Sequence, residues 1–126
     1  MIVPSIAALE RAFGSSAISV AEVGVGRFLD LDRWPDGEIR LSTSVAGRSV
    51  IVLVDPAASL VLVDLDTPDP TVHVALSNVT EMRVEDGPGN VRAITMATSI
   101  PTAGAARLLL HPDIRLHVDF TGQGCD

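Results

Sequence analysis

The three histidines of this chain are the side chains best suited to acid–base or metal chemistry, because imidazole changes charge near neutral pH. His73 and His117 each stand between apolar residues of an alternating segment, so both should point to the wetter face of a strand. If those strands are neighbours, His73, His117 and Asp119 would form a two-histidine, one-carboxylate group with metal-ligand chemistry. The chain has no His-x-His or His-Glu-x-x-His spacing, so isolated, exposed histidines are the simpler interpretation.

A second chemical hypothesis is a small barrel enzyme of the cyclase or isomerase type, which would hold a nonpolar small molecule in an aliphatic cavity. One or two polar groups would supply the polarity there, and Arg40 and Arg83 join His73, His117 and Asp119 as candidates. The serines and threonines lack the spacing of a nucleophile elbow, and the single cysteine has no nearby histidine. No catalytic residue is assigned, and we expect no cofactor and no bound metal.

The charge of the chain narrows the class of partner. Sixteen acidic residues stand against nine arginines, with no lysine, and the formal net charge is −7. Such a surface repels nucleic-acid phosphates and anionic lipids, so we expect neither nucleic acid nor membrane as a partner. One cysteine excludes an internal disulfide, no apolar run is long enough to cross a bilayer, and the start of the chain does not resemble a secretion signal. We expect a cytoplasmic protein.

Apolar residues mark the best candidate for an interface. The segment Val50–Val54 is apolar at every position, so both faces of that strand need cover from the core, the helix or another subunit. Val50, Val52 and Val54 are therefore candidate interface residues. Trp34, the only tryptophan, adjoins a Pro-Asp-Gly turn and is a candidate anchor for a partner; the alternative is that it folds back over the end of the domain.

Turn residues and apolar periodicity predict the elements that carry these groups. Ile6, Leu9 and Phe13 recur at helical spacing between a capping Ser5 and a terminating Gly14, which predicts one short N-terminal helix. Alternation between turn signals then predicts a series of strands. The predicted strands are 18–25, 27–31, 38–43, 50–54, 60–65, 71–76, 79–85, 91–97 and 114–120.

These elements indicate a mainly β fold. Residues 102–110 can form a second short helix, which Pro112 would end. About eight or nine strands joined mostly by short turns favour an antiparallel β-barrel or β-sandwich, since parallel sheets need helices between successive strands. The length of 126 residues and the hydrophobic fraction of 47% fit a single β-rich domain over residues 1–126.

The strand order in the middle of the chain resembles one known family. Leu60–Leu65, a polar loop, Val72–Leu76 and then Asn78–Val84 resemble the middle strands of bacterial pleckstrin-homology-like domains. That family would add a C-terminal helix, which is not predicted after Phe120. We carry no function over from this resemblance.

Three functions follow from these patterns, and the first explains most of the composition. It is a non-catalytic β-rich binding or assembly module, whose expected partner is a second copy or a different protein. The second is the barrel enzyme, for which a small-molecule ligand is left open. The third is metal-dependent binding through His73, His117 and Asp119.

Overall fold

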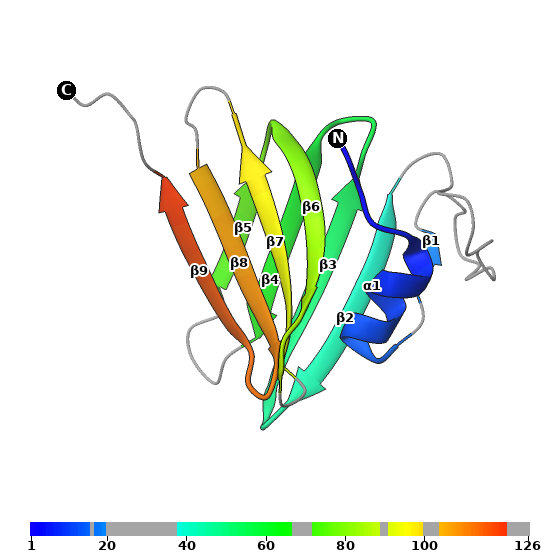
Figure 1. The fold of residues 1–126 in the computed structure, drawn as a ribbon, viewed down its shortest axis with the longest axis vertical. Coiled ribbons are helices and arrows are strands. Elements are labelled where there is room, and N and C mark those ends of the chain that lie inside the picture. Colours follow the sequence, from blue (N-terminus) through cyan, green and yellow to red (C-terminus); the bar gives the residue numbers. More distant parts are fainter. Residues whose placement is uncertain (16, 20–37, 67–71, 89–90, 100–103, 121–126) are drawn as a thin grey trace.

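Alternating apolar side chains bring the strands of this chain into two antiparallel sheets that lie face to face (Figure 1). The computed structural model describes residues 1–15, 17–19, 38–66, 72–88, 91–99 and 104–120. The first sheet has the order β1 (Ile18–Ser19), β2 (Ile39–Val45), β3 (Arg48–Asp55), β4 (Leu60–Asp66) and β5 (Val72–Leu76). The second has the order β6 (Val79–Asp86), β7 (Arg92–Thr98), β8 (Gly104–His111) and β9 (Arg115–Phe120).

The prediction of a mainly β, antiparallel fold with a short N-terminal helix is confirmed, and the architecture is the sandwich. The two sheets are separate among the described residues, so the strands do not close into a barrel. The strand predicted over 27–31 and most of the strand predicted over 18–25 lie outside the described residues. No helix in the described ranges is long and apolar enough to cross a bilayer.

The helix α1 (Ile6–Phe13) begins and ends at the predicted residues. The Ser5 hydroxyl accepts a hydrogen bond from the Ala8 amide at 3.1 Å, which satisfies one of the free amides of the first turn. Gly14 ends the helix with a φ of 71°, and its amide donates to the Glu10 carbonyl at 2.7 Å. The helix contacts β2, β6 and β7, and it buries Ile6, Leu9, Ala12 and Phe13.

A two-residue turn fixes the register of the hairpin between β2 and β3. Ala46 and Gly47 have φ angles of 53° and 80°, and Val45 pairs with Arg48 across the turn. Positive φ at both central residues matches the right-handed twist of the strands. This register places the buried residues of both strands on the inner face of the sheet.

The core lies between the two sheets, where most strands contribute every second residue. On β3, Val50, Val52 and Val54 are at most 1% exposed, while Ile51 and Leu53 face outward and are half-buried. The second sheet supplies the opposite wall of the core. Its fully buried large side chains are Met82, Ile94, Met96, Leu108 and Leu110.

The prediction of a second helix over 102–110 is wrong, because residues from Gly104 onward form the strand β8. Ala106, Leu108 and Leu110 are buried, whereas Ala105 and Arg107 are exposed, which is the two-residue period of a strand. Pairing with β7 on one side and β9 on the other outweighs the helix propensity of alanine and leucine.

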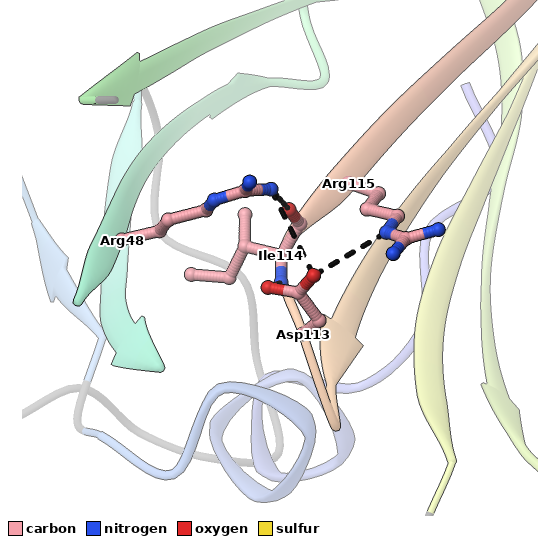
Figure 2. Close-up of polar contacts among 4 residues, drawn as sticks. All are labelled: Arg48, Asp113, Ile114 and Arg115. Carbon is pink, nitrogen blue, oxygen red and sulfur yellow. Dashed lines mark hydrogen bonds and ion pairs between the residues drawn. The ribbon is translucent and has the colours of Figure 1, made fainter. Parts of the chain in front are cut away.

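Polar contacts around Asp113 join the two sheets at one end of the sandwich, as Figure 2 shows. Arg48, at the start of β3, donates to the Ile114 carbonyl at 3.2 Å and lies 3.8 Å from the Asp113 carboxylate. Asp113 also accepts from the Ile114 amide at 2.9 Å and from the Arg115 guanidinium at 3.3 Å. Partial desolvation acts to raise the pKa of Asp113, but these hydrogen bonds and charges outweigh it and lower the pKa.

Replacing Leu108 tests the strand assignment of β8. Leu108→Ala removes a fully buried side chain, so we expect the free energy of unfolding to fall by about 2–5 kcal/mol. Leu109→Ala is the matched control, because Leu109 faces outward and its loss should cost about 1 kcal/mol or less. Urea unfolding followed by circular dichroism measures both, and equal losses would contradict the alternating pattern.

Replacing Asp113 tests the polar contacts between the sheets. Because the folded-state pKa of Asp113 is lowered, its carboxylate stabilises the fold fully above its unfolded-state pKa of about 4 and loses this effect as the pH falls further. We expect Asp113→Asn to lower the free energy of unfolding at pH 7, and the difference from wild type to shrink below about pH 4. Urea unfolding at pH 7 and pH 3 measures this difference, with Asp86→Asn as the exposed control. A difference that stays constant with pH would show that the charge of Asp113 is not involved.

Candidate functional site

The structure places the five candidate catalytic or metal-binding residues on the two outer faces of the sandwich. Arg40 and His73 are exposed on the outer face of the first sheet. Arg83, His117 and Asp119 are exposed on the outer face of the second sheet. The core lies between these two faces, so the five side chains do not converge on one site.

The proposed group of His73, His117 and Asp119 does not form. It required β5 and β9 to be neighbours, but β5 pairs with β4 in the first sheet and β9 pairs with β8 in the second. His73 instead contacts Asp64 on the adjacent strand, with 2.6 Å between Nδ1 and Oδ1. Within the described residues, no three side chains of His, Cys, Asp or Glu are placed to hold a metal ion.

The candidate interface valines belong to the core of the single chain. Val50, Val52 and Val54 are at most 1% exposed and pack against the opposite sheet, so they are not accessible to a partner while the sandwich is folded. The assignment of these three as interface residues is therefore corrected. Trp34, the other candidate, lies outside the described residues.

The outer face of the second sheet brings charged and small side chains together in two rows across the strands. Register places Arg83 beside Thr95, Thr95 beside Arg107, and Arg107 beside His117. The adjacent row contains Glu81, Ala97, Ala105 and Asp119. Cross-strand neighbours of this kind have Cβ atoms about 5 Å apart, so each row forms a continuous surface.

Small side chains in the middle of this face leave a hollow of about 240 Å³. Its lining consists of Glu81, Arg83, Thr95, Met96, Ala97 and Ala105. Alanine and threonine on the two central strands do not fill the space beside the longer side chains of Glu81 and Arg83 on β6. The hollow is therefore open, with a small-residue floor and a charged rim.

Ion pairs hold the charged side chains in and beside the hollow in place. Arg83 Nε donates to Glu81 Oε2 at 2.5 Å, and Arg107 Nε donates to Glu85 Oε2 at 3.2 Å. The hydrogen bond and the attraction from Glu81 raise the pKa of Arg83 above its ordinary value, so it stays charged. Both pairs are exposed and contribute little to stability, which leaves their polar atoms open to exchange for those of a partner.

This geometry suits contact with a macromolecule better than catalysis on a small nonpolar substrate. The hollow is smaller than the roughly 300–1,000 Å³ of small-molecule sites, and its rim is ionic rather than aliphatic. Arg83 is the one catalytic candidate that lines it, and Arg83 is paired with Glu81. The structure therefore does not support the barrel-enzyme alternative.

Sequence reasoning missed the residues that form the hollow. Thr95 and Ala97 lie on a strand that was predicted correctly, but small outward residues carry no signal of their own. Ala105 fell in the segment expected to be helical. The hollow depends on the alignment of three strands, which is a property of pairing and not of any one segment.

Comparison with known proteins identifies the fold but no family. No protein-family model and no curated protein matches the chain. A similar solved structure is a chain of the contact-dependent growth inhibition toxin – immunity protein complex from Klebsiella pneumoniae 342. The TM-score is 0.73 with 12% sequence identity, over 95% of this chain and 96% of that chain. At this identity the likeness establishes a shared fold and nothing further.

Proposed function

We propose that this chain is a non-catalytic binding module whose partner is another protein, as in a toxin–immunity pair. The observation that carries the proposal is the match, over nearly the whole of both chains, with a chain of a toxin–immunity protein complex. The described residues support a non-catalytic role, because the candidate catalytic and metal-binding side chains lie on opposite faces of the sandwich. A protein-binding role needs a shaped surface and no assembled catalytic group.

The outer face of the second sheet is the surface that we assign to the partner. Its small-residue floor lets a partner side chain approach the backbone of β7 and β8, and its charged rim offers both donors and acceptors. Buried apolar anchors surrounded by polar groups are the usual arrangement of protein interfaces. A partner loop that places one apolar or aliphatic side chain in the hollow would fit this pattern.

The charge of the chain indicates what kind of partner would be attracted. With a net charge of −7, the molecule attracts a basic protein over distances longer than any single contact. Electrostatic attraction of this kind mainly increases the association rate, and salt weakens it. We therefore expect the partner to be basic and the association to slow as the salt concentration rises.

Filling the hollow should abolish partner binding. Thr95→Arg places a long side chain in the hollow, whereas Ser42→Arg makes a comparable change on the outer face of the first sheet. The tagged wild type, isolated from its own cells at low salt, should retain one protein in stoichiometric amount. With that protein purified, titration calorimetry should show a dissociation constant weakened about tenfold or more by Thr95→Arg and changed less than about twofold by Ser42→Arg.

Two results would count against this proposal in different ways. If no protein is retained in stoichiometric amount by the wild type, the binding function itself is wrong. If a partner is retained but Thr95→Arg binds it as tightly as the wild type does, the partner uses another face. Circular dichroism and thermal unfolding of each variant establish that the fold is intact.

A further inference from the structure

The edges of the two sheets differ in how they are protected from pairing with another chain. At β6, the N-terminal segment adds a parallel bridge, in which the Ile2 amide donates to the Thr80 carbonyl at 2.9 Å and the Met82 amide to the Ile2 carbonyl at 2.8 Å. At β2, the short strand β1 and the helix α1 lie alongside. On the opposite side, Figure 1 shows β5 and β9 as the outermost strands.

The strand β9 has the features of an edge that can accept another strand. It is six residues long and contains neither proline nor glycine, and its pairing with β8 has no bulge. Proteins usually protect long regular edges with prolines or β-bulges, because the unpaired backbone groups bind other strands, and β9 has neither of these. By contrast, the pairings of β6 with β7 and of β7 with β8 both contain irregularities.

Partly exposed apolar side chains also lie along this side. Leu116 and Val118 of β9 face the core but are only half-buried, since no further strand covers them among the described residues. Val72, on the neighbouring edge strand β5, is 37% exposed although it points inward. A chain docked along β9 would remove this apolar surface from water.

The sequence of β9 is complementary to itself when read antiparallel. In Arg115–Asp119, a basic residue opens the segment, an acidic residue closes it, and Leu116 and Val118 flank His117 at the centre. We propose that a second copy of this chain docks on β9 as an antiparallel strand, with His117 opposite His117 of the second copy. Arg115 then faces Asp119 of the second copy, and the symmetry repeats this pair.

Strand geometry and charge support this register over the one centred on Leu116. Residues directly opposite each other in an antiparallel pair point to the same face of the sheet. A symmetric pair must therefore be centred on a residue, and the alternative registers are centred on Leu116 or on Val118. A shift toward Leu116 would place Arg115 opposite His117 and leave Asp119 without Arg115. Opposite charges facing one another stabilise a strand pair and like charges destabilise it, so the register centred on His117 is favoured over the one centred on Leu116.

The other edge strand does not have this complementarity. A symmetric pairing of β5 about Val74 would place His73 opposite Ala75, with no charge pair on either side of the centre. His73 is also engaged by Asp64 at 2.6 Å. The self-complementary pattern therefore assigns the second copy to β9.

The inference goes beyond the proposed function, because docking of a second copy on β9 and binding of a different protein on the outer face can each occur without the other. Two six-residue strands bury less surface than a standard protein interface. We therefore expect a weak dimer, with a dissociation constant on the order of 10–100 µM.

Charge reversal tests both the edge and the register. Sedimentation velocity of the purified protein, with no other protein present, should show wild type passing from monomer to dimer between about 1 and 300 µM, a range that spans the expected constant. Arg115→Asp or Asp119→Arg alone should weaken the dimer about tenfold, because each places like charges opposite one another twice. The double variant Arg115→Asp/Asp119→Arg should restore the dimer to within about threefold of wild type.

The controls separate this inference from other causes of weakened association. Arg40→Asp makes the same charge change on the first sheet and should leave the dimer unchanged. Because Arg115 also contacts Asp113, Arg115→Asp removes a contact within the chain as well, and Asp119→Arg is the more specific single variant. Thermal unfolding shows whether each variant is folded. A wild type that stays monomeric, or single variants that the double variant does not rescue, would overturn the proposal. A monomer that still binds its purified partner protein would refute this inference alone.

Discussion

The packing of the two inner sheet faces against each other is the interaction on which the rest of the structure depends. Each strand presents apolar side chains at every second position, and neither sheet can shield its own apolar face from water. Val52 of β3 and Leu108 of β8 are both at most 1% exposed because the other sheet covers them. The polar contacts of Asp113 only add to this at one end of the sandwich. Any contact with another protein must therefore use an outer face or an edge.

Local signals in the sequence were enough to predict the elements with local causes. The cap at Ser5 and the end of the helix at Gly14 depend on residues close in the chain, and the structure has both where the sequence predicts them. The prediction of a helix over 102–110 was wrong because the residue types do not show the alternation of β8. Ala105 is exposed and Ala106 is buried, although both are alanine. Pairing with β7 and β9 determines that this segment is a strand, and such pairing involves residues that are distant in the sequence.

The same distinction explains which parts of the candidate site could be predicted. Alternation in the sequence predicted that His73, and His117 with Asp119, point outward, but nothing in the sequence assigned their two strands to different sheets. The segment Val50–Val54 was interpreted as a strand with two apolar faces, and its inward valines were assigned to an interface. The structure shows that the core already covers those valines, so the outward Ile51 and Leu53 are the residues that remain partly exposed.

The outer face and the edge of the second sheet are parts of one continuous surface. The row that begins at Arg83 ends at His117, and the adjacent row ends at Asp119, so both rows reach β9, the last strand of this sheet among the described residues. A second copy docked there would continue the sheet, and its own Arg83 and His117 would extend the same face beyond the edge. Two hollows would then lie on one side of the dimer, related by the two-fold axis through His117. Such an arrangement would let one assembly bind two copies of a partner with no new kind of contact. A partner that is itself dimeric would bind more tightly, because its first contact raises the effective concentration of its second copy at the second hollow.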